Sequence, residues 1–301
     1  MNKKKLIGIF ILLFAYIIAF IGGFITYLLL EKYLELHILM DIFLANVVAT
    51  IIIWIIGIFF KSASIYDPYW SVQTIIIFVC LLVKFQTFNL GIALFLAVLA
   101  IYTIRLTGNF LIGFNDISYI DWRYKQIKEK CGKLYQFVSL IGIHLIPTFV
   151  VYFASVPSFM YIINGLDFSP FNFIGLAVML LGIALEFFAD MDMKKFQKIR
   201  TSKSEIIRVG LWKYSRHPNY LGEIIFWFGV ALVYIIPNFA NGLYFSGAVT
   251  NLLLFIFISV PLADNHLKTY KANYEEYRKE TRCFLPFPRF KIKKNSVTKG
   301  A

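Results

Sequence analysis

The chain has 301 residues, of which 59% are hydrophobic and only 16% are charged, and its mean hydropathy is +0.71. Soluble domains average about 45–50% apolar and about 25% charged residues, so this composition excludes a soluble globular protein and predicts an integral membrane protein. The net charge of +13 would suit a nucleic-acid partner, but the positions of the charges favour a membrane surface instead.

The first predicted element is an apolar run that follows Lys3, Lys4 and Lys5. At about 25 residues this run exceeds the roughly 7–15-residue core of a signal peptide, and no convincing cleavage site follows it. We therefore expect a retained signal anchor, and N-terminal transmembrane helices over residues 1–66.

Apolar runs recur along the chain. They predict eight membrane spans, over residues 6–30, 38–60, 70–83, 90–104, 137–155, 171–189, 221–237 and 247–263. The third and fourth runs are shorter than the ~20 residues that a helix needs to cross the hydrocarbon core, which would suit a tilted or partly embedded hairpin. Pro147 and Pro157 leave the length of the fifth span open. The predicted fold class is an all-α, polytopic transmembrane bundle of about seven or eight spans.

The distribution of positive charge predicts the orientation of the bundle. If the N-terminus lies in the cytosol, 28 of the 30 Lys and Arg residues fall on inner segments, and only Lys32 and Lys84 lie outside. This asymmetry follows the positive-inside rule. Most of the net charge can then lie against anionic lipid. We therefore expect a multi-pass protein with both termini in the cytosol, with the membrane as a partner and no nucleic acid.

Several kinds of site are excluded by the motifs that the sequence lacks. Cys80, Cys131 and Cys283 have no metal-ligand spacing and form no even framework, so we expect neither disulfides nor a metal site. Glycine-rich nucleotide-binding signatures are absent, which excludes Rossmann and P-loop domains. The nucleophile-elbow and zinc-protease motifs are absent as well, which argues against a serine hydrolase or a zinc protease.

Polar residues collect at the inner ends of the predicted spans. The groups are Asp67 to Trp70 after the second span, Tyr102 with Arg105 and Asn109 on the fourth, Asp121 to Tyr124 beyond it, and Glu186 with Asp190 and Lys194 on the sixth. Spacings of three and four residues place the members of the second and fourth groups on one helix face each. A cytosolic site and, for the fourth group, a salt-bridged helix end both fit this pattern.

A further pattern follows the eighth span. Apolar or aromatic residues recur every three or four positions between Leu267 and Thr281, and charged residues occupy the opposite face. This periodicity predicts an amphipathic helix along the inner membrane surface, with His266 and Tyr270 on one face. It fits a tail that lies on the membrane or a lid over a cytosolic pocket. We expect the basic tail, residues 291–301, to be disordered.

The densest polar segment, residues 210–223, runs directly into an apolar span. Pro218 suits the first turn of a helix, so the residues before it stand where free N–H groups would face an anion. Asn219 and Glu223 are four apart and share a helix face. A carboxylate so close to hydrocarbon is costly unless it lines a cavity or has a partner. Glu223 therefore favours a binding site over a basic membrane-surface anchor.

The Arg216-His217-Pro218-Asn219-Tyr220 core of this segment resembles the signature of the steroid 5-alpha-reductase-like integral membrane family, particularly its bacterial branch. Isoprenylcysteine carboxyl methyltransferases and sterol reductases share the Arg-His-Pro-x-Tyr core. The chain from Tyr270 to Pro286 resembles the closing motif of the family. The resemblance implies a catalytic membrane domain over residues 67–290.

The resemblance also implies an activity, the NADPH-dependent reduction of a conjugated C=C bond in a steroid- or isoprenoid-like lipid enone. The cofactor-binding residues would be Glu186, Asp190, Arg216, His217, Asn219, Glu223, His266 and Tyr270. Tyr102, supported by Asp67, would donate a hydrogen bond to the substrate carbonyl, and Trp70 and Arg105 would contact the substrate. An arginine such as Arg216 also offers a bidentate fork to phosphate.

Two alternatives stay open. The shared core equally fits a carboxyl or phospholipid methyltransferase that uses S-adenosylmethionine, and a non-catalytic lipid-binding membrane protein is the third interpretation. The surplus of basic residues between Lys194 and Arg216 favours NADPH, because its additional phosphate needs cationic partners. The sequence leaves the substrate and the oligomeric state open.

Overall fold

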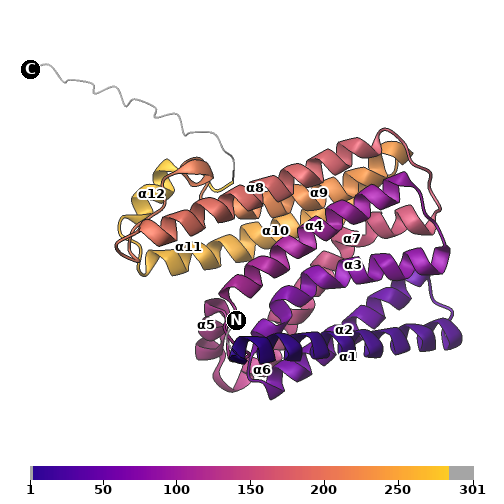
Figure 1. Ribbon diagram of the computed structural model, residues 1–301, viewed down its shortest axis with the longest axis horizontal. Coiled ribbons are helices and arrows are strands. Elements are labelled where there is room, and N and C mark those ends of the chain that lie inside the picture. Colours follow the sequence, from indigo (N-terminus) through magenta and orange to yellow (C-terminus); the bar gives the residue numbers. More distant parts are fainter. Residues whose placement is uncertain (1–2, 285–301) are drawn as a thin grey trace, which may run out of the picture. The chain divides into compact units, whose positions relative to one another are not determined.

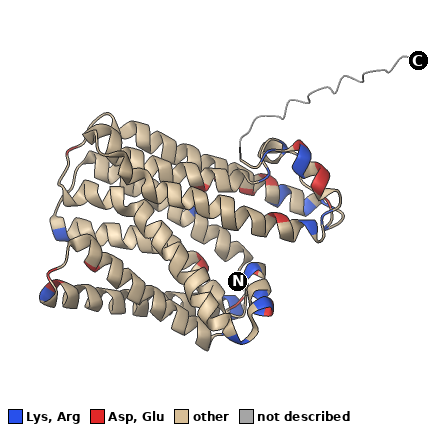
Figure 2. Ribbon diagram, turned by 180° about the vertical axis from the view of Figure 1, so that it is seen from behind, with Lys and Arg blue, Asp and Glu red and all other residues tan. Residues whose placement is uncertain are grey.

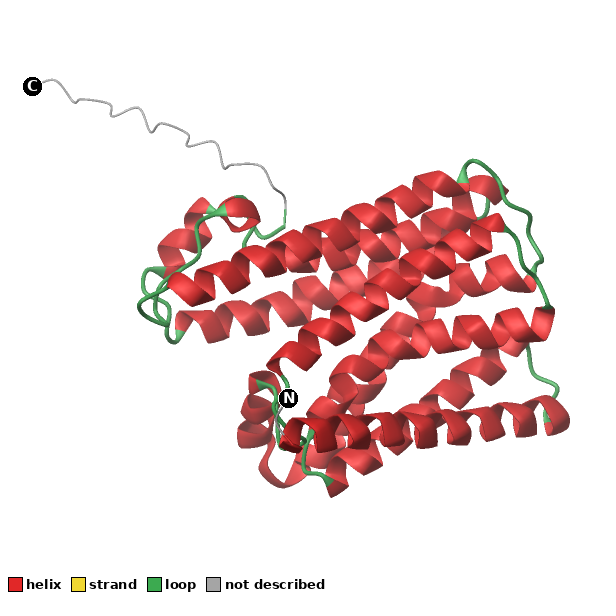
Figure 3. Ribbon diagram, viewed as in Figure 1, coloured by secondary structure: helices red, strands yellow, loops and turns green. Residues whose placement is uncertain are grey.

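The computed structural model describes residues 3–284, and the regular elements of that part of the chain are helices (Figures 1 and 3). The long helices are α1 (Lys3–Tyr33), α2 (Ile38–Phe59), α3 (Tyr66–Phe85), α4 (Leu90–Gly113), α7 (Ile146–Ile163), α8 (Asn172–Ile199) and α9 (Pro218–Asn238). The short ones are α5 (Trp122–Cys131), α6 (Tyr135–Val138), α10 (Ser246–Leu254), α11 (Val260–Lys268) and α12 (Tyr274–Glu280). The predicted all-α class is confirmed, while the predicted disordered tail lies outside the described residues.

Eight helical segments within residues 3–284 are long and apolar enough to cross a membrane, in agreement with the eight predicted spans. Their lipid-facing character is visible in α1, where Phe10 and Phe14 are more than 60% exposed. The protein is therefore an integral, multi-pass membrane protein. The expectation of a short third and fourth span is wrong, because these segments run for 23 and 24 residues. Both helices continue through the polar residues that we took as their ends.

The fifth span is a composite element. A π-helical turn, η3 (Ser139–Leu145), leads directly into α7, and Pro147, which offers no N–H, is the second residue of α7. Pro157 lies inside α7 without ending it. The whole candidate span, Trp122–Ile163, is 42 residues long.

Local signals explain several helix starts. The Asn89 side chain accepts a hydrogen bond from the N–H of Ile92 at 3.0 Å and caps α4. The Asp121 side chain caps α5 in the same way, through the N–H of Arg123 at 2.9 Å. Such caps satisfy N–H groups that a helix start leaves without an intrahelical acceptor.

The chain divides into two compact units. The first comprises the described parts of Met1–Leu180 together with Ile224–Leu254, and the second comprises the described parts of Leu181–Glu223 and Phe255–Ala301. Helices α8 and α9 thus contribute residues to both units. We describe each unit by itself.

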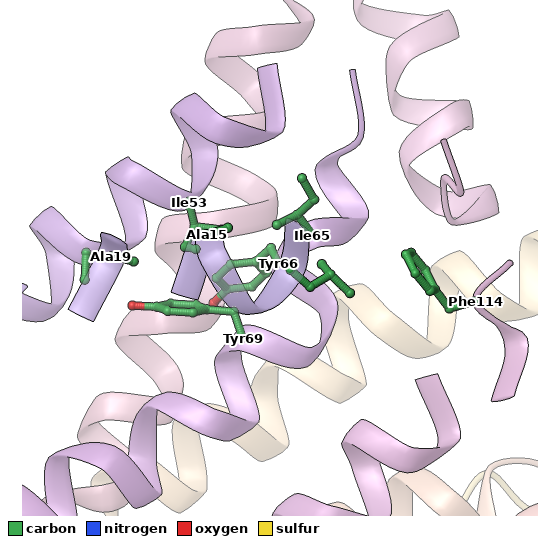
Figure 4. Close-up of a cluster of buried hydrophobic side chains, with 9 residues drawn as sticks. Ala15, Ala19, Ile53, Ile65, Tyr66, Tyr69 and Phe114 are labelled. Atoms are coloured by element: carbon green, nitrogen blue, oxygen red, sulfur yellow. The ribbon is translucent and has the colours of Figure 1, made fainter. Parts of the chain in front are cut away.

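In the first unit α1 packs against α2, α3 packs against α4 and α7, and α10 packs against α7 (Figure 1). One core cluster lies where α1, α2 and α3 meet, and Figure 4 shows Tyr66 and Tyr69 beside Ala15, Ala19 and Ile53. The small side chains of Ala15 and Ala19 let α1 pack closely against its neighbours, and the rings of Tyr66 and Tyr69 fill the space between the helices.

The second unit contains the end of α8, the start of α9, the π-helical turn η6 (Phe255–Ser259), α11 and α12. Charged residues of this unit are concentrated in α12 and in the neighbouring helix ends and turns (Figure 2). The single amphipathic helix expected over 267–281 is interrupted, because α11 ends at Lys268 and Asn273 adopts a left-handed φ of 55° just before α12. Amphipathic character persists in α12, where Tyr274 and Tyr277 are buried and the charged residues between them are exposed.

We expect the segment from 190 to 220 to be cytosolic and the turn after α9 to be external. In a chain whose three cysteines are replaced by serine, Asn241→Cys should react in intact cells with a membrane-impermeant maleimide. Lys203→Cys should react only after the membrane is permeabilised, because both positions are exposed but on opposite sides. Labelling of Lys203→Cys in intact cells would overturn the predicted orientation.

Candidate functional site

The polar segment before α9 is held by the end of the described chain, within the second unit. Helix α9 begins at Pro218, as predicted. Ser215 forms a parallel β-bridge with Arg282, and the N–H groups of Arg216 and His217 donate to the carbonyls of Arg282 and Cys283 at 2.9 and 3.2 Å. The expectation that these two N–H groups face an anion is therefore wrong, because the returning chain supplies their acceptors.

A buried carboxylate joins this segment to α11 and α12. Asp264 accepts a hydrogen bond from Nε2 of His217 at 2.8 Å and another from the Tyr274 hydroxyl at 2.6 Å. Nη2 of Arg216 lies 3.4 Å from the other oxygen of Asp264. All four side chains are buried. Because two cationic or donor groups and a hydroxyl surround Asp264, the cost of burying its charge is offset.

The second terminal nitrogen of Arg216, Nη1, also has protein acceptors. Nη1 donates to the carbonyls of Arg278 and Thr281, at 3.0 and 2.9 Å. Arg216 therefore fixes the end of α12 against the start of α9. Burial, and then the adjoining Asp264 carboxylate, raise the pKa of Tyr274 above its ordinary value of 10.0, so this hydroxyl stays protonated as a donor.

The segment before the signature is docked on α8. Nε1 of Trp212 donates to the carbonyl of Ala189 at 2.9 Å, and the N–H of Leu211 donates to Asp192 at 3.3 Å. Gly210 has a φ of 55°, and a Cβ at this position would overlap the Asp192 carboxylate. Glycine is therefore required here both by the backbone and by the contact.

Helices α8 and α9 touch close to two of the predicted cofactor residues, Glu186 on α8 and Glu223 on α9. A Cβ on Gly222 would lie 2.6 Å from the carbonyl oxygen of Gly182 and would overlap the Glu186 side chain. The two helices are thus in close contact at Gly222, the residue before Glu223. Glu186 and Glu223 are 3% and 7% exposed, so both residues are buried, Glu186 against Gly222 and Glu223 directly after it in α9.

The remaining cofactor candidates are less enclosed. Asp190 follows Glu186 by one turn on α8, and Asp190 and Asn219 are half-buried. His266 and Tyr270 contact each other edge to face, with ring centroids 5.2 Å apart, and Tyr270 is 41% exposed. The structure thus brings together Arg216 with His217, Glu186 with the Gly222–Glu223 turn, and His266 with Tyr270.

The second unit also has a cavity of about 520 Å³ beside the docked segment. Apolar residues of α8 line one side, and Gly210, Lys213 and Tyr214 line another. The eight predicted cofactor residues are not among its lining residues.

The catalytic candidates lie in the first unit. Tyr102 is fully buried, stacked on Phe226 with ring centroids 3.7 Å apart and edge to face with Trp227 at 5.9 Å. Asp67, near the start of α3, accepts a hydrogen bond from the hydroxyl of Tyr124. The packing of Tyr102 fixes the direction of its ring, and the Tyr124 contact fixes the carboxylate of Asp67.

The two substrate candidates occupy different surroundings in the same unit. Trp70 packs, partly buried, against the core cluster of α1, α2 and α3. Arg105 is half-buried and follows Tyr102 by one turn on α4.

Three residues of these networks were missed from the sequence. Asp264 and Tyr274 had no local signal apart from the polar position of Asp264 near the end of an apolar span. Tyr124 belongs to the Asp121–Tyr124 group at the inner end of the spans, but the sequence does not show which residue of that group pairs with Asp67. In the structure α5 begins at Trp122 and carries Tyr124 to Asp67.

In a comparison with known proteins, residues 53–281 match the family described as "Protein of unknown function (DUF1295)". The chain is 29% identical over 118 residues to 3-oxo-5-alpha-steroid 4-dehydrogenase 1 of Macaca fascicularis, covering 39% of this chain and 41% of the relative. It is 29% identical over 140 residues to 3-oxo-5-alpha-steroid 4-dehydrogenase 2 of Rattus norvegicus, covering 46% and 49%. The chain thus spans less than half the length of these curated relatives. No solved structure matches it.

Proposed function

Because the chain belongs to the DUF1295 family and is distantly similar to steroid 5-alpha-reductases, we propose that it is a membrane-embedded reductase that uses NADPH to reduce a conjugated C=C bond in a lipid. The lipid would be a steroid- or isoprenoid-like enone. The activity of the relatives motivates this proposal, and the residues of the two units are its chemical basis.

The observation that carries the proposal is the burial of two carboxylates, one on each of the touching helices α8 and α9. A buried carboxylate in a membrane protein needs hydrogen-bond donors or a cavity. The ribose hydroxyls and the carboxamide of a nicotinamide nucleotide are donors of this kind, and acidic side chains bind ribose hydroxyls in other nucleotide sites. Glu186 and Glu223 therefore suit the neutral, donor-rich parts of the cofactor.

The phosphates need other partners. Nη1 of Arg216 already donates to two carbonyls and Nη2 lies beside Asp264, so we assign Arg216 and His217 a positioning role at the start of α9. Exposed basic residues of the second unit, including Lys195, Lys198 and Lys203, are the better candidates for the phosphates. Asn219, His266 and Tyr270 remain candidates for the nicotinamide side and for a cover over the nucleotide.

In the proposed reaction a hydride adds to the β-carbon of the enone, a proton adds to the α-carbon, and negative charge develops on the carbonyl oxygen. NADPH, when bound, supplies the hydride. The Tyr102 hydroxyl donates to the oxygen, and its stacked ring gives that donor a fixed direction before the reaction begins. Asp67 supports Tyr102 in this role. Tyr124 is the positioning residue for Asp67.

Calorimetry on the detergent-solubilised protein with NADPH, NADH and S-adenosylmethionine tests the proposal. We expect NADPH to bind most tightly, and Glu223→Gln to weaken binding by about 5- to 150-fold, the equivalent of roughly 1–3 kcal/mol for a lost buried acceptor. Glu276→Gln, the same change at an exposed position of α12, is the matched control and should leave the affinity unchanged.

Two results would contradict the reductase. Tight binding of S-adenosylmethionine with no response to NADPH would identify the methyltransferase alternative. Failure to bind any of the three nucleotides would favour a non-catalytic lipid-binding protein.

A further inference from the structure

The first unit contains a cavity of about 530 Å³ between α1, α2 and α3. Its walls are apolar over most of their extent, with Phe20 and Phe24 on α1, Ala45 and Ala49 on α2, and Ile76 and Ile77 on α3. The family match begins at residue 53, so α1 and most of α2 precede it. The cavity is therefore built largely from a part of the chain that the reductase relationship does not describe.

Two buried amides line this cavity. Gln73 is 4% exposed, and neither its Nε2 nor its Oε1 has a hydrogen-bond partner among residues 3–284. Asn46 is 6% exposed, and its Nδ2 likewise has no partner in that part of the chain. Buried polar atoms are nearly always paired, because each unpaired group carries its full desolvation cost. A polar ligand atom between α2 and α3 would satisfy these amides.

The rim of the cavity shows where a ligand would enter. Leu28 on α1 and Val79 and Val83 on α3 line the cavity and are 42–66% exposed. These residues belong to membrane-spanning segments, so the rim faces lipid. At one end of the cavity Lys84 pairs with Glu31, and Nζ of Lys84 lies 5.3 Å from the centre of the Tyr27 ring. The entrance is therefore lateral, between α1 and α3, with a polar closure at one end.

We propose that this cavity binds a lipid alcohol, with its apolar body along α1 and α3 and its hydroxyl at Gln73 and Asn46. A hydroxyl can donate to Oε1 of Gln73 and accept from its Nε2 or from Nδ2 of Asn46. A ketone can only accept and would leave Oε1 unpaired. A carboxylate would bury a charge, and the cation among the lining residues, Lys84, is already paired with Glu31.

The volume also suits such a ligand, because pockets of roughly 300–1,000 Å³ hold molecules of this size. The inference is independent of the proposed reductase activity. It depends on α1 and on the cavity face of α3, whereas Asp67 pairs with Tyr124.

Retinol, a fluorescent isoprenoid alcohol, is a suitable probe. Protein in phosphatidylcholine nanodiscs would be titrated with retinol, and energy transfer from tryptophan would report binding, with Trp54 and Trp70 in the first unit as donors. We expect saturation at one retinol per chain, and a loss of affinity of about tenfold or more in Gln73→Leu, since one hydrogen bond of this kind is worth roughly a factor of ten. Retinyl acetate, which lacks the donating hydrogen, should bind wild type more weakly than retinol does and should lose less affinity than retinol in Gln73→Leu.

Gln136→Leu makes the same chemical change at an exposed position of α6 and should bind retinol like wild type. Without retinol, Gln73→Leu should unfold at the same temperature as wild type or higher, because it removes an unpaired buried amide. Ile77→Trp fills the cavity and leaves both amides in place, so it should also abolish saturable retinol binding. If Gln73→Leu does not fold, the retinol binding of Ile77→Trp tests the proposal in its place. Non-saturable partitioning into wild-type nanodiscs would overturn the proposal, and so would a retinol affinity equal to wild type in folded Gln73→Leu or in folded Ile77→Trp.

Discussion

Replacing Asp264 by alanine should lower the free energy of unfolding by about 3–5 kcal/mol, the usual cost of removing one partner of a buried ion pair. The substitution leaves Arg216 and His217 buried beside each other without their shared carboxylate, and it removes the acceptor of the Tyr274 hydroxyl. Titration with a denaturing detergent, followed by circular dichroism, would measure the change.

The matched control is Glu275→Ala in the same unit. Glu275 pairs with Lys268 at 2.6 Å, but its side chain is 57% exposed, so solvent screens the pair and we expect no measurable change. Asp264→Asn should fall between the two variants, because an amide oxygen still accepts from Tyr274 but cannot balance the positive charge of Arg216. If Asp264→Ala were as stable as Glu275→Ala, the buried network would not hold the signature segment in place.

The second large effect concerns turnover. Tyr102→Phe should reduce the rate of enone reduction by about 10²- to 10³-fold, the usual loss when one preorganised donor to a developing oxyanion is removed. Affinity for NADPH and folding should be unchanged, because the phenylalanine ring preserves the stacking on Phe226. The rate would be followed as NADPH oxidation, with testosterone and an isoprenoid enone as probe substrates.

A suitable control is Tyr234→Phe, in the first unit, whose hydroxyl accepts a hydrogen bond from Asn164 at 3.0 Å. It removes the same atom from a tyrosine to which we assign no role in the reaction, so turnover should stay within about twofold of wild type, as expected of a substitution outside the site. An unchanged rate in Tyr102→Phe would show that Tyr102 is a packing residue of the first unit. Asp67 and Arg105 would then be the next candidates for the hydrogen-bond donor to the substrate carbonyl.

The sequence by itself determined the class of the fold and its main divisions. Apolar runs specify membrane helices because hydrocarbon offers no partner for backbone polar groups, so the helical state follows from composition and length alone. The start of α9 at Pro218 was also predictable from the local sequence, because proline favours the first turn of a helix. The lengths of α3 and α4 could not be predicted from the local sequence, because polar residues near the end of a span can either terminate a helix or continue it within a bundle.

Only the tertiary structure decided which polar groups meet. Asp264 pairs with His217 across 47 residues of sequence, and Tyr124 reaches Asp67 across 57. No local periodicity encodes such pairs, because each depends on how separate helices pack and on which side chain needs a partner once water is excluded. The same reason explains the cavity beside Gln73: its volume is what remains after the side chains of α1, α2 and α3 have packed, and no single segment contains that information.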